Sequence, residues 1–259
     1  MPPRSTAETA DRVTYVGHAT VLLELDGLRF LTDPVLRSKV GPLRRQGPGP
    51  GREVAEQLDA VLVSHLHYDH VDLPSLSRVD RGTPLLAPPG AGRFLERRGF
   101  TAVSELAPGE STRVDGLQIA AVEARHGNGR SPLSRHSQAV GFVVSGAKRV
   151  YFAGDTDLFE GMRALAGDLD LALLPVWGWG PTLGPGHLDP EHAGRAAAML
   201  SPRIVVPIHW GTFFPLGLAR IVPRHLSAPP RDFARCCSRL APQVEVRILA
   251  PGEATSLAA

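Results

Sequence analysis

Residues 64–72 (SHLHYDHVD) gather metal-binding side chains, because three histidines and one aspartate fall within six positions. These residues are His65, His67, Asp69 and His70. Imidazole and carboxylate groups are the ligands that borderline divalent metals such as zinc bind. A polar surface loop that happens to contain histidines is the alternative, but so dense a cluster favours a metal site. The apolar run 60–63 predicts a short buried strand, which places the cluster on the turn at the strand's end.

Three further candidate ligands likewise lie at the end of an apolar run that predicts a strand. His126 follows the run 117–124, Asp155 follows the strand predicted at 148–154, and His209 ends the strand predicted at 203–209. Side chains at the carboxyl ends of strands gather at one edge of a sheet, so we expect all of these ligands to converge there. Scattered surface histidines would have no reason to follow this rule.

The elements that position these side chains are predicted to be many strands and few helices. Two Asp-Gly pairs, at 26–27 and 115–116, predict hairpins. Segment 35–51 is rich in Pro, Gly and Arg and lacks periodicity, so we expect a loop that is functional, mobile or merely a solvated connector. Strands are predicted at 13–17, 20–25, 28–33, 84–88, 138–145, 148–154, 169–176, 203–209 and 244–249, and helices at 73–75, 90–98, 190–200 and 232–240. This pattern indicates the α/β (α+β) class, a layered sandwich with helices outside.

Composition places the chain among ordinary globular enzymes. It has 259 residues, 43% hydrophobic and 21% charged, and a net charge of +2, which gives no support to nucleic-acid binding. Adjacent Cys236 and Cys237 suggest reduced thiols. No signal peptide or membrane span is evident, so we expect a cytoplasmic protein without a transmembrane segment. We expect a loosely held tail at 1–10 and one domain over 11–259.

The chain resembles the metallo-β-lactamase fold superfamily. The resemblance rests on SHLHYDHVD (64–72), the histidine of EARHGNGR (123–130), FAGDTD (152–157) and PIHWGTF (207–213), with GHATVLLE (17–24) and TDPVL (32–36). The last motifs are most similar to the branch that holds L-ascorbate-6-phosphate lactonase and N-acyl-phosphatidylethanolamine phospholipase D. The resemblance implies a four-layer αβ/βα sandwich with a binuclear metal site.

The resemblance also implies roles for the ligands. His65, His67 and His126 would hold one metal, Asp69, His70 and His209 the other, and Asp155 would bridge them. A hydroxide between two metals would attack a carbonyl or phosphorus centre. Asp69 and Asp155 are therefore the expected catalytic residues, Asp69 as ligand and proton acceptor. Two zinc ions are the expected cofactors, with manganese or iron as alternatives.

Other residues are candidates for supporting roles. His18 and Asp33 are expected to hold ligand side chains in place. His18 could instead be a buried histidine bonded to the backbone or a direct metal ligand, and Asp33 could instead form a turn before Pro34. Trp177, Trp179 and His187 are candidate pocket walls, unless the tryptophans simply cover the core. A substrate phosphate could meet Arg37, Arg44, Arg45 or Arg130. We expect His136, His192 and His225 on the surface. The phospholipase-D-like branch has an aromatic residue where this chain has Gly127, which weakens the case for a lipid substrate.

The expected function is metal-dependent hydrolysis of a phosphodiester or of a lactone or other ester, and the sequence does not choose between them. The partner would be a small molecule, phosphorylated in the first case. Nucleic-acid processing by a metallonuclease is an alternative, but the chain shows no inserted nucleic-acid-binding domain. A non-catalytic metal-binding scaffold is another, although the full ligand set argues against a decayed site. A redox di-iron protein would need a flavin module for which there is no room. The sequence predicts no particular oligomeric state.

Overall fold

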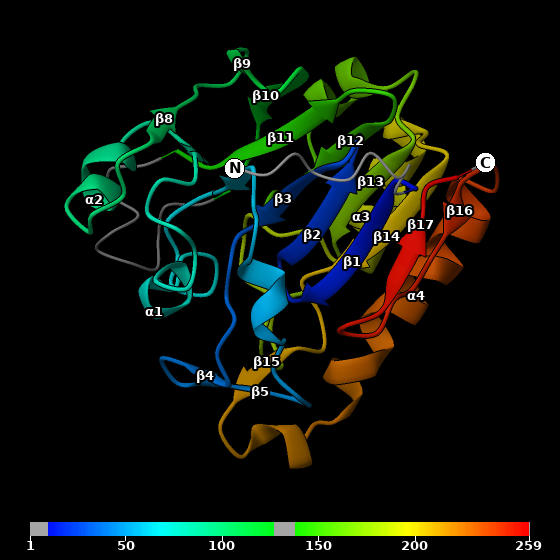
Figure 1. Ribbon diagram of the computed structural model, residues 1–259. Coiled ribbons are helices and arrows are strands. Elements are labelled where there is room, and N and C mark those ends of the chain that lie inside the picture. Colours follow the sequence, from blue (N-terminus) through cyan, green and yellow to red (C-terminus); the bar gives the residue numbers. More distant parts are fainter. Residues whose placement is uncertain (1–9, 127–137, 259) are drawn as a thin grey trace.

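The structure is a computed structural model that describes residues 10–126 and 138–258. Its two large sheets have seven strands each (Figure 1). The first runs in the order β17 (Ala254–Ser256), β1 (Arg12–Gly17), β2 (Thr20–Leu25), β3 (Leu28–Thr32), β6 (Ala60–Leu62), β7 (Leu85–Ala87) and β8 (Val103–Glu105). The second runs in the order β16 (Glu245–Val246), β14 (Ile204–Ile208), β13 (Leu171–Pro175), β12 (Arg149–Phe152), β11 (Val140–Ser145), β10 (Leu117–Glu123) and β9 (Ser111–Val114).

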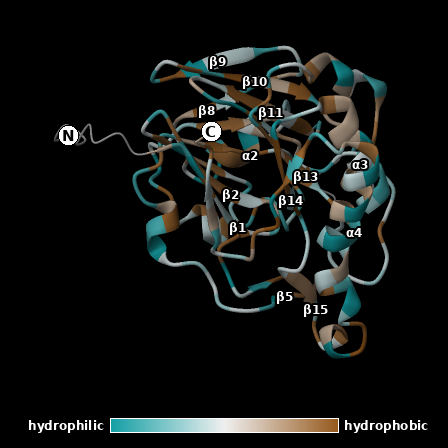
Figure 2. Ribbon diagram, turned by 90° about the vertical axis from the view of Figure 1, so that its right-hand side faces the viewer, coloured by the Kyte–Doolittle hydropathy of each residue, from teal (hydrophilic) through white to brown (hydrophobic). Residues whose placement is uncertain are grey.

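The two sheets pack face to face over the main core. Alternate residues of each strand point inward, so that Val13, Leu23 and Phe30 of the first sheet share one buried cluster with Phe142 and Phe152 of the second. Each large apolar side chain buried in this way contributes about 1.5–3 kcal/mol to folding. Figure 2 shows the hydrophobic colouring gathered on these central strands.

Helices cover the outer faces of both sheets. The first sheet packs against α1 (Leu73–Leu76) and α2 (Gly92–Glu96), and the second against α3 (Pro190–Leu200) and α4 (Arg224–Leu240). Three 3₁₀ helices, η1 (Arg52–Ala55), η3 (Glu160–Leu165) and η4 (Leu218–Arg220), complete the described helical segments. The order helix, sheet, sheet, helix confirms the predicted four-layer αβ/βα sandwich. No helix within the described ranges combines the length and the apolar character that crossing a bilayer requires.

Both predicted Asp-Gly hairpins are confirmed by the backbone. Asp26 and Gly27 have φ values of 49° and 78°, and Asp115 and Gly116 have values of 43° and 100°. Two successive positive φ angles are the geometry of the two-residue turn that matches the twist of paired strands. The turns set the registers of β2 with β3 and of β9 with β10.

The strand directions bring the candidate ligands to one edge. Strands β3, β6 and β7 are parallel to one another, as are β12, β13 and β14. Strand β10 runs antiparallel to β11, which runs antiparallel to β12, so β10 and β12 point the same way. The carboxyl ends of β10, β12 and β14 therefore face one edge of the second sheet, and the ligand atoms of His65 and His67, which follow β6 of the first sheet, lie within 4.8 Å of that of His126 at this edge.

The predicted loop over 35–51 is irregular for most of its length but includes two short strands that were not predicted. This segment contains β4 (Lys39–Val40) and β5 (Leu43–Arg45), which form a three-stranded sheet with β15 (Phe213–Pro215). Each strand is too short to show a hydrophobic periodicity, and β15, the strand that pairs with β5, lies far away in the sequence. The sequence pattern alone could not reveal it.

Two predicted boundaries near the C-terminus also differ. Helix α4 begins at Arg224 rather than at 232, with Pro229 and Pro230 inside it. Both prolines are buried, and α4 packs along α3, so tertiary packing outweighs the weak helix propensity of proline here. The strand predicted at 244–249 pairs only over Glu245–Val246. Residues 1–9 of the expected tail lie outside the described ranges.

Candidate metal centre

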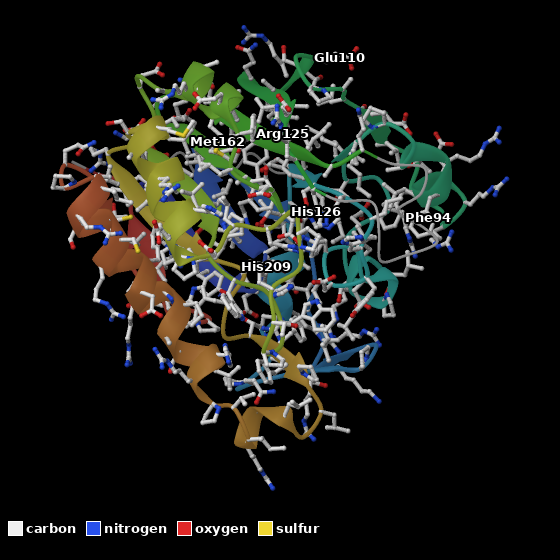
Figure 3. The ribbon with its side chains drawn as sticks, turned by 180° about the vertical axis from the view of Figure 1, so that it is seen from behind. Phe94, Glu110, Arg125, His126, Met162 and His209 are labelled. Carbon is white, nitrogen blue, oxygen red and sulfur yellow. The ribbon has the colours of Figure 1, made fainter. Side chains whose placement is uncertain are left out.

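The turn after β6 carries the dense histidine cluster into the interior. The backbone N–H groups of His70 and Val71 both donate to the carbonyl of His67, at 3.0 and 2.8 Å. This tight turn aims His65, His67, Asp69 and His70 toward the same space, where all four side chains are buried. Figure 3 shows His126 and His209, from distant parts of the chain, meeting in the same central region.

Three imidazoles form the first half of the centre. The ligand atoms of His65, His67 and His126 all lie within 4.8 Å of one another. His67 Nδ1 and His126 Nε2 are 3.1 Å apart. The structure therefore brings together the three residues that were predicted to share one metal.

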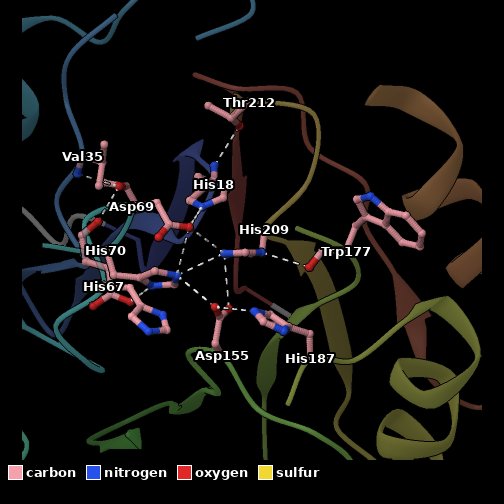
Figure 4. A network of polar contacts seen from close by, with 12 residues as sticks. His18, Val35, His67, Asp69, His70, Asp155, Trp177, His187, His209 and Thr212 are labelled. Carbon is pink, nitrogen blue, oxygen red and sulfur yellow. Dashed lines mark hydrogen bonds and ion pairs between the residues drawn. The ribbon is translucent and has the colours of Figure 1, made fainter. Parts of the chain in front are cut away.

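Two imidazoles and a carboxylate form the second half. His70 Nε2 lies 3.1 Å from His209 Nε2, and Asp69 Oδ2 lies 3.8 Å from each of these two nitrogens (Figure 4). These three are the residues predicted to share the other metal. His18 reaches the same space and belongs to the same group of close ligand atoms.

Asp155 lies between the two halves. Its Oδ2 is 3.1 Å from His70 Nε2 and 3.9 Å from His65 Nε2, and its Oδ1 is 3.3 Å from His209 Nε2. Among the described residues, it is the carboxylate with ion-pair contacts to imidazoles of both halves. This is the position that a bridging ligand requires.

The side chains fit a metal pair in their spacing. Two nitrogens bound at about 2.0–2.1 Å to a tetrahedral zinc lie about 3.3–3.4 Å apart, close to the observed separations of 3.1 Å. His65 Nε2 and Asp155 Oδ1 are buried and have no hydrogen-bond partner among the described residues. Buried polar atoms are rarely left unpaired, so these atoms fit the role of metal ligands.

The far ring nitrogens fit the same role. In four of the histidines Nδ1 has its own acceptor, which orients the ring so that Nε2 faces the site and can bind a metal once it carries no proton. The acceptors are the Ser64 hydroxyl for His65, the Asp33 carboxylate for His70, the Gly186 carbonyl for His126 and the Trp177 carbonyl for His209.

Asp33 and His18, the residues expected to support ligands, contact candidate ligand side chains. Asp33 Oδ2 accepts from His70 Nδ1 at 2.7 Å and from the Ser64 hydroxyl at 2.5 Å. His18 Nε2 donates to Asp69 Oδ2 at 3.0 Å. Both supporting residues are fully buried, so they fix the orientation of the ligands they contact.

Strained backbone marks the same region. His18, Asp33 and His209 have φ values of 60°, 33° and 61°, which residues other than glycine seldom adopt. Each turns the chain sharply at the end of a strand, so that the side chain enters the site. The conformation is held by surrounding bonds, including the His209 N–H donating to the His18 carbonyl at 2.8 Å. Such strain clusters at functional sites.

Burial and charge pairing separate the protonation states of these groups. Burial lowers the pKa of His65 and His209 well below the ordinary value, and that of His67 to about 4, so these imidazoles are neutral. Burial opposes ionisation of Asp155, but the surrounding imidazoles hold its pKa well below the usual range. Burial likewise opposes protonation of His70, yet Asp155 and Asp33 raise its pKa well above the ordinary value.

Comparison with known proteins agrees with the fold and the ligand motifs. A family model described as a beta-lactamase superfamily domain matches residues 28–210, which is more than half of the chain. The chain belongs to the metallo-β-lactamase superfamily. A solved structure of this superfamily's fold, the metallo hydrolase Igni18 of Ignicoccus hospitalis, superposes with a TM-score of 0.72 at 26% identity and covers 95% of this chain and 98% of that one.

Curated relatives extend this likeness in sequence. A UPF0173 metal-dependent hydrolase of Methanopyrus kandleri is 34% identical over 93% of this chain and 98% of its own length. The N-acyl-phosphatidylethanolamine-hydrolyzing phospholipase D 1 of Caenorhabditis elegans is 33% identical over 79% of this chain. The chain spans 64% of that protein's length and 59% of the length of three uncharacterized mycobacterial relatives.

The loop residues that were predicted to line the site, Trp177, Trp179 and His187, lie at different distances from the candidate ligands. His187 Nε2 lies 3.3 Å from Asp155 Oδ2, and the His187 ring stands edge-on to that of His126 with centroids 4.7 Å apart. His187 therefore contacts the candidate ligands directly, rather than only lining the pocket around them. Trp177 contributes its carbonyl to His209, and the Trp179 ring lies 6.4 Å from that of Tyr68. Arg130 and His136 lie outside the described residues.

Two of the candidate phosphate-binding arginines have other partners. Arg37 forms a two-pronged ion pair with Asp72, at 2.8 and 2.6 Å. Arg45 is buried and donates to the carbonyls of Val16, Val35 and Arg37, so the prediction that it meets a substrate is not supported. Arg44 is exposed and remains available.

Several contributors to the site were missed from the sequence. Tyr15 and Thr212 accept from the His18 N–H at 3.0 and 2.8 Å and so fix the strained turn. Ser64 joins Asp33 to His65. His225, which was expected on the surface, is partly exposed and stacks on Trp177 with ring centroids 5.4 Å apart. Of these residues, only Ser64 and Thr212 could have been suspected from the sequence, because both lie within the motifs SHLHYDHVD and PIHWGTF.

Proposed function

We propose that this protein is a hydrolase that uses two divalent metal ions to activate water against an ester, a lactone or a phosphodiester. The observation that carries the proposal is the position of Asp155 between two separate groups of three ligands. Histidine-rich ligation suits zinc, with manganese and iron as alternatives. When bound, such a metal pair lowers the pKa of water and supplies a nucleophile at neutral pH.

The seven candidate ligand side chains would bind the two metal ions in two groups of three, with one shared carboxylate. His65, His67 and His126 would hold one ion, and Asp69, His70 and His209 the other. Asp155 would contact both and fix their separation. Because four of the imidazoles are oriented through Nδ1, the site is organised before any substrate arrives.

Asp69 is the candidate proton acceptor. Burial opposes its ionisation, but the hydrogen bond from His18 and the nearby imidazoles hold its pKa below the ordinary range, so it stays ionised at neutral pH. His18 occupies Oδ2, which leaves the second carboxylate oxygen, Oδ1, for a proton or a metal. Asp69 and Asp155 are thus the carboxylates placed to touch the reacting atoms.

His187 is the candidate for contact with the substrate. Burial lowers its pKa, but the Asp155 carboxylate outweighs this and raises it above the ordinary value. Its Nδ1 donates toward the carbonyls of Gly184 and Pro185, which holds the ring over the site. A protonated or hydrogen-bonding Nε2 at this place can orient a carbonyl or phosphoryl oxygen. Trp179 and Tyr68 offer an apolar wall beside it.

The arginines favour an uncharged acyl substrate, a lactone or other ester. Arg37 and Arg45 have internal partners, so among the described members of the predicted set only Arg44 is free to meet a phosphate. The phosphodiester remains the second candidate because the C. elegans relative is named as a phospholipase D. Nucleic-acid processing and a non-catalytic metal scaffold are the further alternatives, and each predicts no turnover of small esters.

One experiment tests the proposal. Metal content of the purified protein is measured, and hydrolysis is assayed with a simple lactone, a phosphorylated lactone, a phosphodiester and a β-lactam. We expect two metal ions per chain and turnover of one of the first three substrates. Bound metal without turnover of any substrate, including single-stranded RNA and DNA, would favour the scaffold. A chain that binds no metal would refute the proposal.

A further inference from the structure

The connection between β15 and α4 exposes large apolar side chains. Leu216 and Ile221 are 67% and 74% exposed, and the next most exposed large apolar residue in the described chain is Ile248 at 38%. Soluble proteins usually bury such side chains or use them for contact with a partner. This connection includes η4 and lies at the lower end of Figures 1 and 2, beside the three-stranded sheet.

Unpaired cations surround the two apolar residues. Lys39 and Arg44 are cross-strand partners, and Arg44 also lies opposite Phe214 on β15. Arg220 ends η4 and Arg224 begins α4. All four cations are exposed, and none makes an ion pair within the ranges that the structure describes. We call Lys39, Arg44, Leu216, Arg220, Ile221 and Arg224 the basic–apolar tip.

The segments that build the tip carry basic residues and no acidic ones. Segments 34–52, 176–188 and 203–231, which build the tip and the adjoining loops, contain no Asp or Glu. Some exposed arginines elsewhere have acidic partners close by, as in Arg163 with Glu160, Arg195 with Glu191 and Arg247 with Glu245. The near-neutral net charge of the chain therefore conceals one strongly basic face.

The tip joins the wall of the metal site. The His225 ring, next to Arg224, stacks on Trp177, whose carbonyl accepts from the ligand His209. Phe213, at the start of β15, packs in one cluster with Tyr68 and Trp179. A partner held by the tip would therefore lie on the same side of the molecule as the site loops.

We propose that the basic–apolar tip docks this protein on an anionic lipid bilayer. Exposed aliphatic side chains ringed by lysine and arginine match a membrane interface, because the aliphatic groups enter the acyl boundary while the cations meet lipid phosphates. The tip is small, so the attachment is weak, reversible and sensitive to salt. The proposal does not depend on the hydrolase activity.

Vesicle co-sedimentation of the full chain tests the docking. We expect binding to vesicles of phosphatidylcholine and phosphatidylglycerol in a two-to-one mixture, weak binding to phosphatidylcholine alone, and loss of binding at high salt. Arg220→Glu with Arg224→Glu should weaken binding at least tenfold, and Ile221→Ser severalfold. The matched controls are Arg93→Glu with Arg97→Glu, at exposed positions on α2 and its C-cap, and Ile248→Ser; both should bind as the unchanged protein does.

Three results would overturn the proposal. The first is equal binding to neutral and anionic vesicles, or none to either. The second is equal loss of binding in the tip variants and their controls. The third is self-association, detected by light scattering without lipid and abolished by Ile221→Ser, because the tip would then be the interface with a second copy of the chain. Melting temperatures of all variants show whether each is folded, and binding needs no substrate turnover to be measured.

Discussion

The imidazole of His18 donates through Nε2 to Asp69 Oδ2 over 3.0 Å, and both side chains are buried. The His18 ring also lies against that of His209, with centroids 3.8 Å apart. His18 thus contacts two of the predicted ligands from the side facing the protein interior. Its Nδ1 is buried with no partner in the described chain.

His18→Asn should lower kcat about 10–100-fold with both metals retained, because Asp69 loses the donor that orients it. KM should change little, since His18 does not face the substrate wall. The measurement is steady-state kinetics together with metal content. His192→Asn, at a half-exposed position on α3, is the matched control and should leave both unchanged. Loss of one metal ion in His18→Asn would show that His18 is itself a ligand.

Asp155→Ala should abolish activity and reduce the metal content, because both halves of the centre lose a shared carboxylate. The metal-free protein should also be less stable, because the protonated imidazole of His70 would lose Asp155, one of the two carboxylates that stabilise its charge. Metal analysis and turnover measure the first effect, and thermal unfolding the second. Asp168→Asn, at an exposed position, is the control. Full activity with two metals in Asp155→Ala would refute the bridging role.

Asp33→Asn should weaken metal binding about 10–100-fold, because Asp33 sets the ring orientation of His70 and also holds Ser64. The larger effect should fall on the metal held by His70, since His70 contacts Asp33 directly whereas His65 is linked to Asp33 only through Ser64. Competition with a chelator, followed by metal counting, separates a one-metal from a two-metal species. Equal weakening of both metals would mean that Asp33 supports the fold rather than one ligand.

Arg45→Met and Arg44→Met form a matched pair on β5. Arg45→Met leaves buried carbonyls without their donors and should lower the free energy of unfolding by about 2–4 kcal/mol. Arg44→Met, at the exposed neighbour, should change stability by less than about 0.5 kcal/mol. Denaturant unfolding measures both. If the substrate is a phosphodiester, Arg44→Met raises its KM, and an unchanged KM would count against that substrate.

Metal affinity should rise with pH through the neutral range. The raised pKa of His70 keeps it protonated in the metal-free protein, and a metal must displace that proton. His65, His67 and His209 have lowered pKa values and are already neutral. The His70 proton stabilises the metal-free fold fully below about pH 6.5 and less as the pH rises through its raised pKa. Calorimetry in two buffers should detect proton release, and pH-independent affinity would contradict this.

The candidate ligands could be predicted from the sequence because their chemistry is a property of residue type and local position. Each of His65, Asp155 and His209 follows an apolar strand, and strands of one direction bring their ends to one edge. The Asp-Gly hairpins were equally local, since two positive φ angles belong to those residues whatever surrounds them. The helical layers outside the sheets followed from the same patterns.

What the tertiary structure decided depends on contacts between residues that are far apart in the chain. The sequence could not show that Arg45 turns inward, that β5 pairs with β15, or that His187 approaches Asp155. Tyr15 and Thr212, whose hydroxyl groups lie 3.4 Å apart, are separated by 197 positions in the chain. Residue type sets which metal and which nucleophile a site can use, whereas packing sets which arginines are free and what surrounds the substrate. The sequence alone therefore predicted the set of candidate metal ligands, and only the folded chain decided what surrounds them.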